Sequence, residues 1–224
     1  MSDLHLEVDL EPLKYLFENS YDDTIVMAGD IAPLSMLPYV LEEISEKCDN
    51  IIIVPGNHEF WGQSLEEGLE LIKEINGSFN NAKVVYNNIL PVDNRLIVGT
   101  TLWYERTNMV LDGDNHDFKC IDGFYPSDMI KEYQKAVKFL KLYPRTGDII
   151  VTHHSPSELS LNLKTFVPRA YRYMFCNDGH DGYNICKYMK PKYWIHGHTH
   201  NCTRYKIKDT EIISNPLGFG PYTD

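Results

Sequence analysis

Apolar positions along this chain fall into two patterns. Short continuous apolar runs at 24–27, 51–54 and 148–152 predict buried strands, whereas apolar residues at helical spacing in 33–48 and 64–75 predict helices. The first four of these elements therefore alternate strand, helix, strand and helix. That order is typical of a parallel sheet whose strands are connected by crossover helices, so the chain is expected to be an α/β protein.

The rest of the chain mixes short strands with two stretches that have no regular spacing, residues 103–127 and 155–181. No linker, repeat or low-complexity run interrupts the sequence, so we expect one domain that spans residues 1–224. The further elements predicted are strands at 83–86, 89–92, 95–100, 193–195, 203–207 and 211–214, and helices at 128–142 and in a segment ending near Met189.

Four of the predicted strands end directly in clusters of Asp, Asn and His. In open α/β sheets, ligands bind just beyond the carboxyl ends of the strands. Imidazole and carboxylate groups together are the donors that divalent transition metals prefer, and two such sites sharing one carboxylate would form a two-metal clamp. The clusters are Gly29-Asp30, Gly56-Asn57-His58, His153-His154 and the segment His196 to His200.

A family resemblance rests on five motifs that occur in order over nearly the whole chain: Asp3-Leu4-His5, Gly29-Asp30, Gly56-Asn57-His58-Glu59, Thr152-His153 and Gly197-His198-Thr199-His200. The series resembles the signature of the calcineurin-like metallophosphoesterase superfamily, small phosphoesterase type. The resemblance implies a four-layer α/β fold in which two mixed β-sheets pack face to face with helices outside. Members place an apolar strand before the first motif. Only Met1 and Ser2 precede Asp3 here, so we expect that strand to be truncated and Asp3 to be loosely held.

The same resemblance implies roles for individual residues. It implies two divalent metal ions (manganese, iron, zinc or nickel), which would carry out hydrolysis of phosphomonoesters or phosphodiesters by in-line attack of a metal-bridging hydroxide. His58 would contact the phosphate and supply a proton or a hydrogen bond to the departing oxygen. We interpret His154 and His196 as neighbours of the site and His116 and His180 as loop residues. The implied ligands are Asp3, His5 and His200 for the first metal, Asn57, His153 and His198 for the second, and Asp30 as the bridge.

Departures from the family pattern narrow the substrate class. The protein Ser/Thr phosphatases of this superfamily carry Gly-Asp-x-x-Asp-Arg-Gly, but residues 31–34 after Asp30 lack that Asp and Arg, so this subclass is disfavoured. Leu217 stands where many small members have an arginine. Small molecules such as nucleotides are the default substrates. We expect Arg106, Arg169 and Arg172, in the two irregular stretches, to bind substrate together with His58.

Composition limits the partners. The net charge of −11 argues against a long nucleic acid, whose phosphates need a basic face. No apolar run is long enough to span a membrane, no signal-peptide pattern is present, and the five cysteines are scattered, which favours a cytoplasmic protein with reduced thiols. The sequence gives no indication of an oligomeric state. The alternatives are a non-catalytic, protein-binding scaffold of the same fold and a nuclease of the superfamily.

Overall fold

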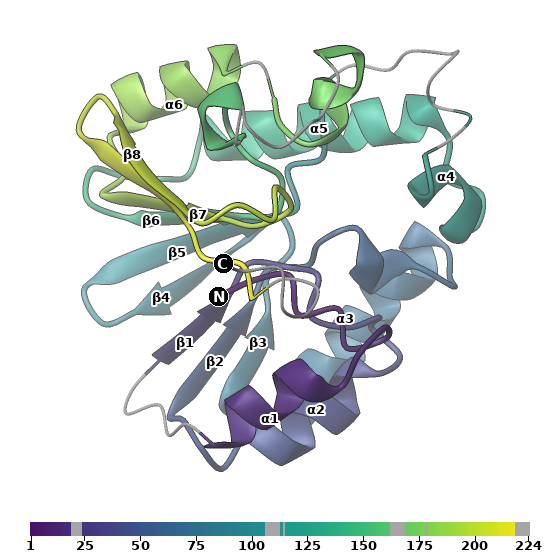
Figure 1. The fold of residues 1–224 in the computed structure, drawn as a ribbon. Coiled ribbons are helices and arrows are strands. Elements are labelled where there is room, and N and C mark those ends of the chain that lie inside the picture. Colours follow the sequence, from purple (N-terminus) through teal and green to yellow (C-terminus); the bar gives the residue numbers. More distant parts are fainter. Residues whose placement is uncertain (19–23, 106–112, 114, 162–168, 178, 218–224) are drawn as a thin grey trace.

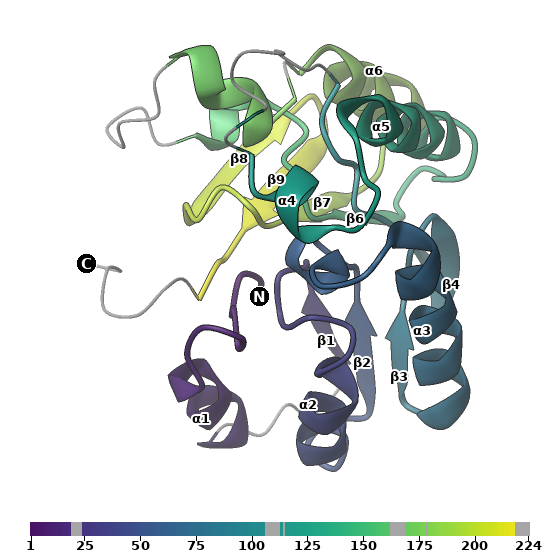
Figure 2. The same cartoon turned by 90° about the vertical axis from the view of Figure 1, so that its right-hand side faces the viewer.

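The structure, a computed structural model, describes residues 1–18, 24–105, 113, 115–161, 169–177 and 179–217. Two β-sheets pack face to face, and helices cover the outer face of each sheet, which makes four layers (Figures 1 and 2). The four-layer α/β architecture expected from the sequence is therefore confirmed.

The smaller sheet contains three parallel strands in the order β1, β2 and β3, and the larger sheet contains six in the order β4, β5, β6, β7, β9 and β8. In the larger sheet the outer pairs β4–β5 and β9–β8 are antiparallel, and the inner pairs are parallel. Within the described residues only the larger sheet is thus mixed. The strands are β1 (Thr24–Met27), β2 (Asn50–Ile53), β3 (Ala82–Val84), β4 (Asn88–Val92), β5 (Arg95–Thr100), β6 (Ile149–Thr152), β7 (Tyr193–His196), β8 (Thr203–Ile207) and β9 (Thr210–Ser214).

Helices α2 and α3 lie outside the smaller sheet with α1 beside them, and α5 and α6 lie outside the larger sheet (Figure 1). Helix α3 starts where the sequence offers a capping box, because Ser64 and Glu67 each bond the other's backbone N–H. Helices α1 and α4 have no counterpart among the predicted elements. The helices are α1 (Glu11–Glu18), α2 (Leu37–Ile44), α3 (Leu65–Ser78), α4 (Asp117–Cys120), α5 (Pro126–Leu140) and α6 (His180–Met189), with short 3₁₀ turns η1 (His58–Phe60), η3 (Glu158–Ser160) and η4 (Arg169–Met174).

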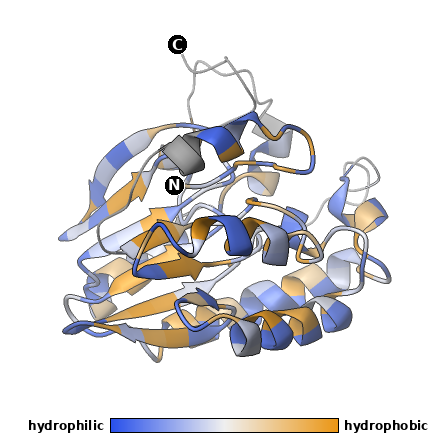
Figure 3. Ribbon diagram, turned by 90° about the horizontal axis from the view of Figure 1, so that it is seen from below, coloured by the Kyte–Doolittle hydropathy of each residue, from blue (hydrophilic) through white to orange (hydrophobic). Residues whose placement is uncertain are grey.

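Strand side chains alternate between two apolar layers. In β1, Ile25 and Met27 face the helices, whereas Val26 faces the space between the sheets. Hydropathy colouring shows the strands to be mainly hydrophobic and the helices to be mixed (Figure 3). The layer between the sheets is built from buried residues of both sheets, so it fixes how the strand ends face one another: Ala28, Ile52, Val54, Val85, Ile97 and Val151.

The first three residues are held against β1. The Met1 ammonium donates to the Val26 carbonyl, and the Asp3 N–H donates to the Gly29 carbonyl, both at 2.9 Å. On the other side, Ser2 pairs with Pro216 in a parallel bridge. Asp3 is fully buried, so the expectation that it would be loosely held is wrong for this structure.

No helix in the described part of the chain is long and apolar enough to cross a membrane. The longest is α5, with 15 residues, and one of its faces carries Lys131, Lys135 and Lys138.

Replacing Ile52 by Ala should destabilise the fold by about 2–5 kcal/mol, because Ile52 is 1% exposed between two rigid sheets that cannot close the cavity. Leu142→Ala serves as the control, because Leu142 is 63% exposed. Urea unfolding of both variants measures the effect. Equal unfolding free energies for the two would contradict this account of the core.

Candidate metal centre

The polar clusters that follow the strands meet at one edge of the two sheets. Asp30 follows β1, Asn57 follows β2, His153 follows β6 and His198 follows β7. Parallel strands end at the same edge of their sheet, and the two sheets face each other, so four loops converge. The segment that starts with Asp3 lies beside the loop after β1 and completes the cluster.

One group of donors consists of Asp3, His5 and His200. Their candidate ligand atoms lie within 4.8 Å of one another. The Nε2 atoms of His5 and His200 are 3.2 Å apart, and His200 Nε2 is 3.5 Å from Asp3 Oδ1. Three donors of this kind, two imidazoles and one carboxylate, can hold one divalent cation.

A second group consists of Asp30, His153 and His198, again within 4.8 Å. His153 Nε2 is 3.1 Å from Asp30 Oδ2 and 3.1 Å from His198 Nδ1. Burial lowers the pKa of His153, but the charge and hydrogen bond of Asp30, together with Asp3 and the Ala28 carbonyl, outweigh it and raise that pKa to about 10. His153 Nε2 and Asp30 Oδ2 thus face each other at the place where a cation would bind.

Asp30 connects the two groups. Its Oδ2 atom is 3.1 Å from His153 Nε2 and 3.8 Å from His5 Nε2. Burial raises the pKa of Asp30, but His153 and other nearby histidines hold it well below its usual value. Asp30 is thus a buried carboxylate placed to serve both groups.

Two backbone carbonyls orient the imidazoles of the second group. His153 Nδ1 is 2.8 Å from the Ala28 carbonyl, and His198 Nε2 is 2.8 Å from the Met174 carbonyl. A carbonyl only accepts, so these nitrogens carry protons, and the opposite nitrogens, His153 Nε2 and His198 Nδ1, face the centre. Burial lowers the pKa of His198 to about 3, which keeps its Nδ1 lone pair available.

Asn57 is oriented by a residue from a distant segment. Its Nδ2 atom donates to Asp117 Oδ1 at 2.8 Å, and since a carboxylate only accepts, the amide oxygen must point the other way. Within the described structure, the Asn57 Oδ1 atom is buried and has no hydrogen-bond partner. An orphaned buried oxygen is costly unless something binds it, so it fits a cation in the second group.

Glu59 holds two of the loops together. Its carboxylate accepts from the backbone N–H groups of Asp30 and Ile31, each at 2.8 Å, and of Gly56 at 2.7 Å. The side chain is fully buried, and burial together with the charge of Asp30 raises its pKa to about 7. Glu59 stands in the third motif, but sequence reasoning assigned it no role.

The backbone at the site is unusual. Five non-glycine residues adopt left-handed conformations with φ of 58° at Asp3, 50° at His5, 55° at Asp30, 65° at His198 and 46° at His200. Such conformations cost energy and gather where function imposes them. Gly29 has φ of 83°, and a Cβ there would lie 2.6 Å from the Gly56 nitrogen, so only glycine allows the two loops to approach this closely.

His58 is fixed on three sides. Its backbone N–H donates to Asp30 Oδ1 at 3.0 Å, its ring stacks on Trp61 with centroids 3.5 Å apart, and its Nδ1 lies 2.7 Å from Glu7 Oε1. Burial lowers the pKa of His58, but the bond to Glu7 and the charge of Asp30 raise it on balance. Burial likewise raises the pKa of Glu7, yet hydrogen bonds from His5 and His58 bring it down to about 2.

The remaining histidines stay outside these two donor groups. His154 is buried, its ring lies 4.1 Å from that of His198, and its Nδ1 is 3.3 Å from the Thr101 carbonyl. His196 bonds to Ser160 Oγ at 2.8 Å. His180 is the first residue of α6 rather than part of a loop.

A cavity of about 250 Å³ opens beside the second group. Of the three arginines predicted to bind substrate, Arg106 and the side chain of Arg169 lie outside the described residues. Arg172 belongs to η4 and is not among the residues that line this cavity, so its contact with substrate stays a prediction. The lining consists mainly of aromatic and amide side chains: Asn57, His58, Trp61, Asn115, His116, Asp117, Met174, Phe175 and His198.

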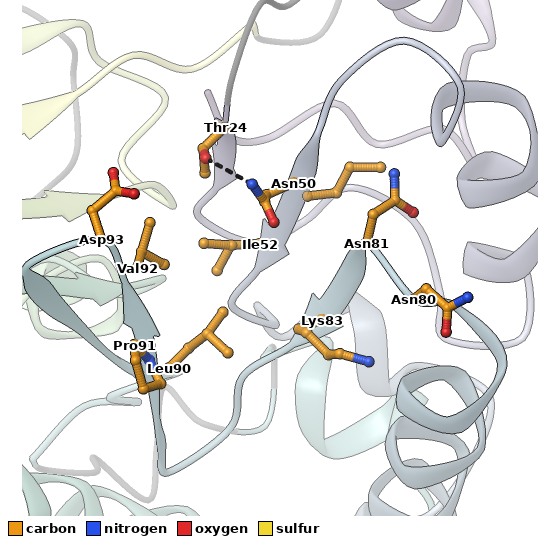
Figure 4. Close-up of a pocket in the computed structure, with 11 residues that line it drawn as sticks. Thr24, Asn50, Ile52, Asn80, Asn81, Lys83, Leu90, Pro91, Val92 and Asp93 are labelled. Atoms are coloured by element: carbon orange, nitrogen blue, oxygen red, sulfur yellow. Dashed lines mark hydrogen bonds between the residues drawn. The ribbon is translucent and has the colours of Figure 1, made fainter.

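Another cavity, of about 320 Å³, lies at the opposite ends of the strands (Figure 4). Two of its polar side chains, Lys83 and Asn81, bond to the surrounding backbone. Lys83 donates to the carbonyls of Asn76 and Phe79, both at 2.8 Å, and Asn81 donates to the Ser45 carbonyl at 2.7 Å. This cavity also lacks the histidines that gather at the other edge.

Comparison with known proteins gives a consistent result. A family model described as calcineurin-like phosphoesterase matches residues 1–202. An uncharacterised protein of Acanthamoeba polyphaga mimivirus is 24% identical over 254 residues, an alignment that covers 98% of this chain and 90% of that protein. The crystal structure of phosphopantetheinyl hydrolase from Mycobacterium tuberculosis has a TM-score of 0.76 at 14% identity and covers 100% of this chain and 92% of that one. At this identity the likeness concerns the fold.

Glu59→Gln should destabilise the protein by about 1–3 kcal/mol. Both carboxylate oxygens accept N–H groups, so in either orientation the glutamine NH₂ would face a backbone donor. Glu74→Gln, an exposed position on α3, is the matched control and should stay within about 0.5 kcal/mol. Urea unfolding measures the free energy of unfolding of both variants. A Glu59→Gln protein as stable as the wild type would show that the carboxylate does not hold the loops together.

Asp117→Ala should weaken binding of manganese by about 10–100-fold, because the Asn57 amide would lose the partner that aims its oxygen. Asp117→Asn keeps an oxygen in the same place and should bind manganese nearly as well as the wild type. Isothermal titration with metal-free protein measures both affinities. Equal losses in the two variants would mean that the negative charge of Asp117, and not orientation of Asn57, matters.

Proposed function

The chain belongs to the calcineurin-like phosphoesterase family, and from this premise we propose that it hydrolyses phosphoesters of small molecules with two divalent cations. The observation that carries the proposal is the position of Asp30 Oδ2, 3.1 Å from His153 of one donor group and 3.8 Å from His5 of the other. One carboxylate shared by two nitrogen-rich groups is what a pair of neighbouring cations requires.

In this proposal each donor group holds one cation. Asp3, His5 and His200 would hold the first, Asn57, His153 and His198 would hold the second, and Asp30 would serve both. The cations would make hydroxide available at neutral pH and neutralise charge on the phosphoryl oxygens. The nitrogen-rich donor set favours manganese, iron, zinc or nickel over magnesium and calcium, which prefer oxygen.

The protein's own side chains position the substrate and move one proton. His58 Nε2 lies 3.9 Å from Asp30 Oδ2, so it faces the centre and can donate to the departing oxygen. Trp61 stacks on the His58 ring, with centroids 3.5 Å apart, and restricts its rotation. The cavity of about 250 Å³ beside the second group suits the organic part of a small phosphoester rather than a polymer.

We choose the substrates to be tested from the residues that line this cavity and from the structural neighbour, the phosphopantetheinyl hydrolase. The panel includes nucleoside monophosphates, cyclic nucleotides and 4-nitrophenyl mono- and diesters. It also includes a phosphopantetheinyl ester, because the neighbour with TM-score 0.76 is described as a phosphopantetheinyl hydrolase. Aromatic residues such as Trp61 and Phe175 on the wall favour members with a planar group.

Turnover should vanish in chelator and return on addition of manganese. Asp30→Asn should lower turnover by more than about 100-fold, because both cations depend on this carboxylate. Loss of a residue that only orients a metal ligand costs less than this. Asp49→Asn, at an exposed position, is the matched control. Initial rates on 4-nitrophenyl diester, with metal content by elemental analysis, test the proposal. Full turnover after complete metal removal, or an unaffected Asp30 variant, would refute it.

A further inference from the structure

The two ring nitrogens of His58 have different surroundings. Nε2 faces Asp30 Oδ2 at 3.9 Å, and Nδ1 lies 2.7 Å from Glu7 Oε1. Glu7 lies two positions beyond His5, on a segment far from His58 in sequence. Its side chain is 20% exposed, so solvent only partly competes for it.

The same carboxylate oxygen reaches a second imidazole. Glu7 Oε1 is also 3.2 Å from His5 Nδ1, and the rings of His5 and His58 meet edge to face with centroids 4.4 Å apart. A carboxylate accepts and does not donate, so the Nδ1 atoms that face it carry the protons. His5 is then left with a lone pair on Nε2, the atom that faces Asp3, Asp30 and His200.

His58 differs from His5 in what its Nε2 atom must do: in the proposed reaction it carries a proton, whereas His5 Nε2 keeps a lone pair. When Nδ1–H is bound to Glu7, any second proton that the ring takes up must sit on Nε2, which faces the centre. We propose that Glu7 is a positioning residue that holds the His58 ring so that its Nε2 proton is directed at the leaving oxygen. This inference rests on the proposed function, because it assumes a departing oxygen at that side of the centre.

The step balances as follows. The bond between phosphorus and the leaving oxygen breaks, its electron pair stays on that oxygen, and the oxygen takes the proton from His58 Nε2. Water supplies the oxygen of the new bond to phosphorus and releases a proton, which restores His58 through solvent. Glu7 exchanges no proton in this sequence; it keeps Nδ1–H in place.

The kinetic test compares leaving groups. Glu7→Ala should lower the rate on a phenyl or alkyl ester by about 10²-fold or more, since these alcohols need a proton, but by less than about tenfold on the 4-nitrophenyl ester, whose phenolate leaves unaided. Glu7→Gln keeps an oxygen that can accept from Nδ1–H and should recover part of the loss. Glu11→Ala, an exposed acid on the same segment, is the matched control.

A spectroscopic arm does not depend on turnover. Histidine ¹⁵N–¹H spectra of cation-free protein, with His58 assigned from a His58→Gln spectrum, should show a proton on His58 Nδ1 that Glu7→Ala removes. An equal rate loss on all esters, or a His58 Nδ1 signal unchanged in Glu7→Ala, would overturn the proposal. A wild type that hydrolyses no ester even with manganese would refute the proposed function instead, and the spectra would still show whether Glu7 orients the ring.

Discussion

The site depends above all on three hydrogen bonds to one buried carboxylate. Glu59 accepts backbone N–H groups from the loops after β1 and β2 and so holds Asp30 and the Gly56 turn in fixed relation. A buried carboxylate without these donors would be costly, and the donors without it would be orphaned. Each loop therefore satisfies the other, and the left-handed backbone of Asp30 persists because Glu59 holds it.

The other candidate metal ligands are also oriented by hydrogen bonds to acceptors from distant parts of the chain. The Ala28 and Met174 carbonyls set the proton positions on His153 and His198, and Asp117 sets the direction of the Asn57 amide. These three acceptors come from three different segments of the chain. The ability of the site to hold cations is thus a property of the assembled fold and not of the motifs alone.

Much of the framework could be predicted because the signals were local. Strand β1 and the ends of β2, β6 and β7 followed from continuous apolar runs that stop at polar residues, and the four layers followed from the family resemblance. The roles of Glu59, Glu7 and Asp117 depend on partners far away in sequence, and no spacing rule reveals such pairs. Asp3 was expected to be loose because only two residues precede it, but its N–H bonds to Gly29 and its Oδ1 accepts the His198 N–H at 2.8 Å.

That last hydrogen bond joins residues 195 positions apart, so two segments far apart in the sequence meet inside the centre. On the ribosome, at about 5–20 residues per second, roughly 10–40 s separate the synthesis of Asp3 from that of His198. During this time neither donor group is complete, because each needs a histidine from the segment around β7. A nascent chain can therefore complete either donor group only after the segment around β7 has been synthesised. Completion of the donor groups thus requires segments that follow strands of both sheets, so it reports that both halves of the sandwich have closed.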